Sequence, residues 1–243
     1  MNKCSALWAK INRPKSSEVI VSLLGAQLKY PVVTRWNSLY DSIKNVLLHK
    51  SKLNELCQKL GIESFLEIDF KYLADYVQLL QPLADAIDFL QTSVGMLFGY
   101  LLPALATIKT KLTKIQINSE SEHTRWMAGA LMSAVNERFS AYVNLEKNAE
   151  DAVIASILCP AVKCRWIKAI NPELEANAEL EAVKLAKNAV MAMSNIEGNA
   201  SSSTDGIVAN YFDFSIEGTF SNCNENFILC VRRFPKKNKL FFQ

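Results

Sequence analysis

Glycine and proline, the residues that most often form turns, are scarce in this sequence. It contains 8 glycines and 7 prolines among 243 residues, too few for an all-β sandwich, which needs a turn about every ten residues. Half of the residues are hydrophobic. This is enough to bury a substantial core and argues against disorder of the whole chain. The composition therefore predicts a folded, mainly α protein.

Long apolar runs and targeting signals are missing as well. No stretch approaches the roughly 20 apolar residues of a membrane span, and the first residues have no apolar core of signal-peptide length. We therefore expect no membrane partner and a cytoplasmic or nuclear location. In such a reducing compartment the six cysteines are expected to be thiols, mostly buried.

Metal and nucleotide sites lack their usual residues. The histidines and the closest cysteine pairs do not supply a zinc site with four ligands; these residues are His49, His123, the pair Cys159 and Cys164, and the pair Cys223 and Cys230. Neither a G-x-x-x-x-G-K nor a G-x-G-x-x-G run is present. We predict no metal site, no cofactor and no catalytic residues.

Charge is nearly balanced over the whole chain but not along it. Lys and Arg total 27 against 24 Asp and Glu, a net charge of +3. The first 60 residues carry ten basic side chains against three acidic ones, a net charge of +7. The basic ones are Lys3, Lys10, Arg13, Lys15, Lys29, Arg35, Lys44, Lys50, Lys52 and Lys59. Such a distribution, more than the total, indicates an anionic partner.

Helical periodicity is strongest from Leu66 onward. Apolar residues at steps of four and three form one stripe there: Leu66, Phe70, Leu73, Val77, Leu80, Ala84 and Ile87. Pro82 lacks a backbone donor and is expected to kink or break this helix. A second helix is expected from about Val94 to Ile115, with Pro103 either inside it or dividing it in two.

Three more helices are expected before the sequence changes character. They cover residues 127–142, residues from Glu150 to before Pro160, and residues 172–196. A glycine and a Ser-Ser-Ser-Thr run then indicate a linker, and no clear period follows. We therefore predict three parts: a basic segment over residues 1–50, an α-helical domain over 51–196, and a linker with an irregular tail over 197–243.

The most informative stretch, residues 30–43, reads Tyr-Pro-Val-Val-Thr-Arg-Trp-Asn-Ser-Leu-Tyr-Asp-Ser-Ile. Thr34 is expected to cap a helix whose inward face is Trp36, Leu39, Tyr40, Ile43 and Leu47. Arg35 then projects from the first turn. Two interpretations stay open: the Arg-Trp pair contacts a phosphate and stacks on a base, or it is a buried Trp beside a surface Arg, which physics alone favours.

The same stretch resembles the Thr-Arg-Trp-Asn-Ser signature of hAT transposases, the hobo and Activator group. Other elements resemble segments of that family in the same order: Cys4 to Pro14, Leu79 to Leu83, Leu101 to Leu105, Leu131 to Phe139, and Ala155 to Lys163. The resemblance covers about residues 1–170. Cys159 and Ala161 depart from it, because the family usually has Asp and Arg at these positions.

The resemblance implies a helical bundle like the insertion domain of a ribonuclease-H-like transposase. In this family two Asp upstream of the signature and one Glu well downstream bind the divalent metal ions, and we find no counterparts of them here. Glu137 lies in a Ser-Ala-Val-Asn-Glu-Arg-Phe-Ser stretch, but this precedes the Leu-Cys-Pro element, whereas the family's Glu follows it. The resemblance thus implies a nuclear, transposase-derived fragment that is not an enzyme.

The resemblance also assigns candidate binding residues. Arg35, Trp36 and Asn37 are the expected DNA-binding residues, and the partner is DNA, bound weakly and largely without sequence preference. Two alternatives stay open. In the first, the chain is an α-helical protein-protein interaction module that pairs through the apolar helical face between Leu66 and Ile115. In the second, it is a transposon remnant without a selected function.

Overall fold

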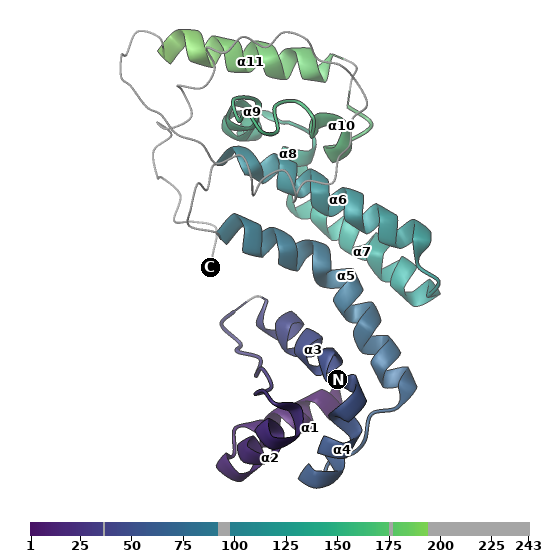
Figure 1. Ribbon diagram of the computed structural model, residues 1–243. Helices are drawn as coiled ribbons and strands as arrows, with labels where there is room; N and C mark the ends of the chain where they lie inside the picture. The colour runs from purple at the N-terminus through teal and green to yellow at the C-terminus, as the bar shows by residue number, and fades with distance from the viewer. Residues whose placement is uncertain (36, 92–97, 175–176, 194–243) are drawn as a thin grey trace. The chain divides into compact units, whose positions relative to one another are not determined.

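The computed structural model describes residues 1–35, 37–91, 98–174 and 177–193 (Figure 1). Within these ranges 77% of the residues are helical and none is in a strand, so the mainly α prediction is confirmed. The predicted linker and tail over residues 197–243 lie outside the described residues, as does the beginning of the second predicted helix.

The chain divides into two compact units. Unit 1 contains residues 1–87 and 119–127, and unit 2 contains residues 88–118 and those from 128 onward. Helices α5 and α7 therefore contribute residues to both. The boundaries expected from the sequence, at residues 50 and 196, were placed where the composition changes. The two units are instead defined by which residues pack together.

Unit 1 is built from short helices around one apolar core. Its complete helices are α1 (Asn2–Ile11), α2 (Pro14–Leu24), α3 (Ser38–Leu48) and α4 (Lys50–Leu60). Pro14 begins α2, where its missing N–H costs nothing. Gly25 and Gly61 end α2 and α4 in the left-handed conformation, with φ of 75° and 63°, which glycine adopts without strain. The largest fully buried side chains here are Leu7, Ile20, Ile43, Leu53 and Leu56.

Helix α5 (Glu67–Gln91) follows the predicted apolar stripe only in part. Phe70, Leu73 and Ala84 are buried as expected, but Leu66 precedes the helix and is exposed. The helix continues through Pro82, so a break at this residue, one of the two expected outcomes, is wrong, and α5 instead bends along its course (Figure 1). Pro82 is itself buried, so its packing offsets the lost backbone hydrogen bond.

Unit 2 is arranged around helix α9, which is buried along most of its length. Its elements are η1 (Phe98–Tyr100), α6 (Leu101–Asn118), the greater part of α7 (Glu122–Arg138), α8 (Ser140–Val143), η2 (Lys147–Ala149), α9 (Glu150–Ile157), α10 (Ile167–Ile170) and α11 (Ala178–Met193). Helix α9 lies between α6 and α11 (Figure 1) and is buried from Ala152 to Ile157. Helix α10 packs on α6 beside the fully buried Trp166.

The predicted helices of unit 2 are present with shifted ends. Pro103 lies in the first turn of α6, where a missing N–H is tolerated, so it does not divide the helix. Helix α9 ends before Pro160 as expected. The third predicted helix begins earlier, at Glu122, and the fifth later, at Ala178. Across the described ranges, no helix is both long and apolar enough to cross a membrane.

The backbones of η1 and α9 approach each other closely at Gly99. A Cβ atom on this residue would lie 2.4 Å from the carbonyl oxygen of Ala155, far inside van der Waals contact. Only a residue without a side chain therefore lets η1 pack on α9 at this position.

We predict that Gly99→Ala lowers the free energy of unfolding by about 1–3 kcal/mol, because the backbone has to move apart. Gly129→Ala is the control: its Cβ would lie 3.1 Å from Nε2 of Gln116, the end of a side chain that can move. Inside α7, alanine is also the better helix former. Thermal and denaturant unfolding measure both, and equal stability of the two variants would contradict the close approach.

Candidate functional site

The signature segment before α3 is held by turns and not by a capping threonine. The backbone N–H of Arg35 donates to the Val32 carbonyl at 3.0 Å, and that of Ser38 to the Arg35 carbonyl at 3.1 Å. The Ser38 hydroxyl accepts from the Val32 N–H. Because these turns come first, α3 begins at Ser38 and Thr34 is exposed. The expected cap at Thr34 is therefore wrong.

Asn37, one of the three expected DNA-binding residues, takes part in the packing of unit 1. Its side-chain Nδ2 donates to the backbone carbonyl of Ala84 at 3.0 Å, which joins the start of α3 to α5. The residue is half-buried. This hydrogen bond gives Asn37 a structural role, and a DNA contact by the same residue stays a prediction.

Of the other two expected DNA-binding residues, the structure describes Arg35 but not Trp36. Arg35 is exposed, and no carboxylate of the described chain forms an ion pair with it. Trp36 lies outside the described residues. Whether its indole is buried or faces a ligand, the choice left open by the sequence, therefore stays open.

Arg35 lines a groove with a volume of about 640 Å³. One wall is the face of α1 that carries Ser5, Trp8 and Ala9; the other is the chain from Tyr30 to Arg35, with Leu39 of α3 beside it. The lining is largely apolar, and its exposed side chains that can donate hydrogen bonds are those of Ser5, Tyr30, Thr34 and Arg35. We call this feature the α1 groove.

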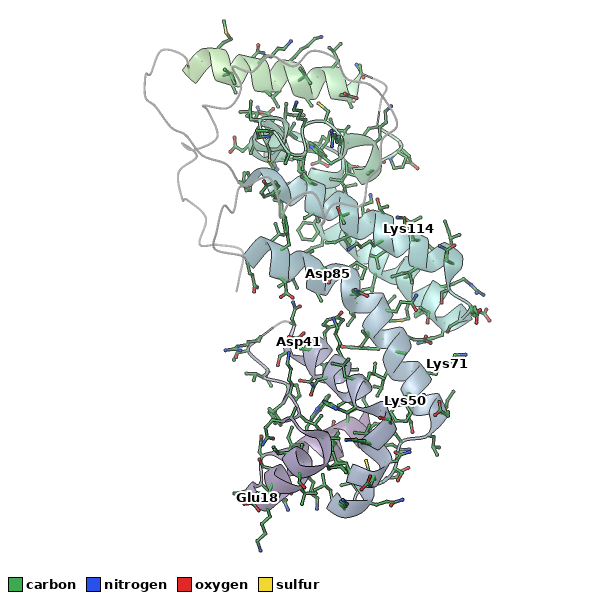
Figure 2. The ribbon with its side chains drawn as sticks, viewed as in Figure 1. Glu18, Asp41, Lys50, Lys71, Asp85 and Lys114 are labelled. Atoms are coloured by element: carbon green, nitrogen blue, oxygen red, sulfur yellow. The ribbon has the colours of Figure 1, made fainter. Side chains whose placement is uncertain are left out.

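Positive charge remains around the α1 groove after the ion pairs of unit 1 are counted. Lys3, Lys50 and Lys59 pair with carboxylates at 2.7–3.0 Å. Within the described chain no ion pair forms with five other cations: Lys10, Arg13, Lys15, Lys29 and Arg35. They occupy the end of α1, the start of α2 and the segment that forms the second wall. The acidic Glu18 and Asp41 lie on α2 and α3 (Figure 2) and do not line the groove.

Helix α1, which forms the first wall of the groove, is held by its buried apolar side chains and by the ion pairs of Lys3. Lys3 bridges Asp69 at 2.7 Å and Glu63 at 2.9 Å. The hydrogen bond from Lys3, together with one from the Leu66 backbone N–H, holds the pKa of Asp69 below its usual value. The same carboxylates raise the pKa of Lys3. Both charges are therefore favoured in the folded state.

Side chains that bind metals do not gather anywhere in the described ranges. No group of three or more His, Cys, Asp or Glu residues there is close enough to hold an ion. The described cysteines are thiols, three of them buried: Cys4, Cys57 and Cys159. Burial raises the pKa of Cys57 to about 11. Glu137 is exposed on α7.

The groove-lining residues of α1 and Tyr30 were not among the expected site residues. Tyr30 lies four positions before Thr34, where the signature begins, and this proximity was the one signal in the sequence that pointed to it. Ser5 and Trp8 lie more than 20 positions away, and only the fold brings them to Arg35.

No protein-family model, curated protein or solved structure was found to match this chain.

The Lys3–Asp69 pair generates a pH-dependent prediction. Because the pKa of Asp69 is lower in the folded than in the unfolded state, its contribution to stability is present above the unfolded value, near 4, and is lost as the pH falls through the folded value. Asp69→Asn should therefore unfold at lower urea concentration than the unmodified chain at pH 6.

This difference should shrink as the pH is lowered below 4. Glu55→Gln, which removes an exposed pair within one helix, is the control and should change the urea midpoint little at either pH. A difference between Asp69→Asn and the unmodified chain that is independent of pH would contradict the assigned role of the ion pair.

Proposed function

We propose that this chain is a fragment derived from a hAT-type transposase, that it does not cut DNA, and that it binds DNA weakly through the surface around Arg35. The proposal includes a nuclear location, which the resemblance implies. The observation that carries the binding proposal is the position of Arg35, exposed at the α1 groove, whose lining segments adjoin Lys10 and Lys29, cations that form no ion pair within the described chain.

The charge of unit 1 suits the backbone of a nucleic acid. Each Lys or Arg that neutralises a phosphate releases counterions, which favours binding and makes it dependent on salt. Arg35 offers a planar, always charged fork that fits a phosphate. The other two signature residues have different assignments: Trp36 is proposed to stack on a base, while Asn37, which donates to the Ala84 carbonyl, is proposed to hold the start of α3 beside the contact surface and to touch DNA there.

The proposal of an inactive chain rests on the resemblance. Two-metal phosphoryl transfer needs several carboxylates around the ions, because they hold the attacking and leaving oxygens in line. Glu137, the residue with the most similar sequence context, is an exposed residue of α7, and we assign it no catalytic role.

A second candidate function is supported by exposed apolar side chains of unit 1. Leu66 and Ile68, at the start of α5, are 60% and 68% exposed, and Tyr72 is 47% exposed. Leu66 is the first residue of the predicted apolar stripe, whereas Ile68 and Tyr72 lie off it on the exposed side of α5; the three side chains would suit pairing with an apolar protein surface. Apolar pairing changes little between 50 and 200 mM salt, whereas DNA binding falls steeply over that range.

Arg35 and Trp36 are predicted to affect DNA affinity in different ways. Arg35→Ala should lower the slope of log affinity against log salt by nearly one unit, because one phosphate contact is lost. Trp36→Ala should weaken binding to hairpin or single-stranded DNA more than to duplex, because stacking is lost. Lys71→Ala, at an exposed cation of α5 (Figure 2), is the control and should leave the slope unchanged.

These effects are measured by fluorescence anisotropy over a salt series, with thermal melting of each variant alongside. If Trp36→Ala unfolds the protein and Arg35→Ala leaves the affinity unchanged at every salt concentration, the signature serves packing alone and the binding proposal fails.

The absence of cutting is predicted for the purified chain. With Mg²⁺ or Mn²⁺ it should leave supercoiled DNA and transposon-end duplexes intact over hours, as judged by gel electrophoresis. Glu137→Gln should behave identically. Metal-dependent nicking that Glu137→Gln abolishes would show that this glutamate is catalytic.

A further inference from the structure

The α1 groove has the volume of a ligand site and a lining that combines apolar and polar groups. Its volume of about 640 Å³ falls within the roughly 300–1,000 Å³ of typical ligand pockets. Apolar walls from Trp8, Pro31 and Leu39 are combined with the hydroxyls of Ser5 and Thr34 and the guanidinium of Arg35. Such a lining suits a ligand that is flat and apolar over most of its area, polar at its edges, and negatively charged at one end.

A nucleotide of a single strand has this chemistry. We propose that the α1 groove binds one base of single-stranded DNA, with the base against Tyr30 and the neighbouring phosphate at Arg35. This inference rests on the proposed DNA binding and adds to it the binding groove, the form of the DNA and a further contact residue, Tyr30.

Tyr30 is suited to stacking by its exposure. The residue lines the groove and is 48% exposed, so about half of its surface is open to a ligand. Bases stack on such rings whatever their sequence, because every base has an aromatic face. A base in a duplex already has both faces stacked and both edges enclosed, so only an unpaired base can enter the groove.

The cations outside the groove favour a strand over a small anion. Among the described residues Arg35 is the one charged residue that lines it, but Lys29 directly precedes Tyr30, Lys10 directly follows Ala9, and Arg13 and Lys15 lie at the turn after α1. None of the four forms an ion pair within the described chain. Cations next to both lining segments would match a repeating phosphate backbone that extends beyond one bound base.

An acidic peptide with an aromatic side chain is the main competing occupant. It would use the same guanidinium and the same apolar walls, but it would engage one or two cations and not the whole set. The experiment therefore includes a polyglutamate peptide beside the nucleic acids.

The first measurement is binding of the full chain to a fluorescent 15-nucleotide oligothymidine, to a duplex of matching length, and to polyglutamate. Tyr30→Ala should weaken binding of the single strand by roughly 5- to 150-fold, the range that corresponds to loss of one stacked base. It should affect the duplex far less. Tyr30→Phe should retain affinity, because the ring is kept.

Tyr72→Ala is the matched control. Tyr72 lies in the same unit and is equally exposed, at 47%, but does not line the α1 groove. Its replacement should leave the affinity unchanged. Equal effects of Tyr30→Ala and Tyr72→Ala, or an equal loss of duplex and single-strand binding in Tyr30→Ala, would overturn the groove assignment.

A second measurement locates the base without any substitution. An oligonucleotide carrying 5-bromodeoxyuridine is crosslinked by light to the unmodified chain, and the crosslinked peptide is identified by mass spectrometry. The crosslink is expected at Tyr30 or Trp8. Crosslinks confined to residues outside the groove would overturn the inference even if a variant failed to fold.

The outcomes separate the two proposals. Single-strand binding that depends on Arg35 but neither depends on Tyr30 nor crosslinks to the groove refutes this inference and leaves the proposed function standing. Absence of binding to every DNA at low salt refutes both. Binding of polyglutamate in place of DNA, lost in Arg35→Ala, also refutes both and makes the groove a peptide site.

Discussion

Burial of one face of α1 is the constraint on which the arrangement of unit 1 depends. Cys4, Leu7, Trp8 and Ile11, spaced at steps of three, one and three, are all buried in the core, so the helix can face the core in only one rotation. Ser5 and Ala9 then lie on the neighbouring strip of the helix surface and form the groove wall. The position of this groove wall therefore follows from the burial of the apolar face of α1 in the core.

The second wall depends on hydrogen bonds more than on apolar burial. The described residues between α2 and α3 form no helix, and two of their backbone donors bond to side chains of α3: Lys29 to Asn45 at 2.9 Å, and Val32 to the Ser38 hydroxyl. Val32 and Val33 are exposed, so little apolar area holds this segment in place. A wall that is fixed by its backbone leaves its side chains available to a ligand.

Periodicity in the sequence predicted the parts of the fold where an amphipathic stripe is long. This holds for α5 and α6, whereas the end of the short, largely buried α9 was predicted from Pro160. Helices α1, α2 and α4 were not predicted, although the spacing of Cys4, Leu7, Trp8 and Ile11 contains the signal. Charge was the more conspicuous property of that segment. A helix break at Pro82 was one of the predicted outcomes, and it is wrong because the helix continues through this residue. Burial of the surrounding side chains, worth about 1.5–3 kcal/mol each, offsets the cost of about 3 kcal/mol for a proline inside a helix. The groove could not be predicted, since no spacing rule connects Ser5 with Arg35.

Each unit has a buried cysteine thiol whose rate of chemical modification reports local unfolding of that unit. The thiolate is the form that reacts with alkylating reagents, and a thiol with a pKa of about 11, as at Cys57, is ionised to only about one part in ten thousand at pH 7. Cys4 and Cys57 lie in the core of unit 1 and Cys159 in that of unit 2. The rate at which each is modified therefore measures how often its own core admits solvent, and two rates would distinguish one cooperative protein from two units that open separately.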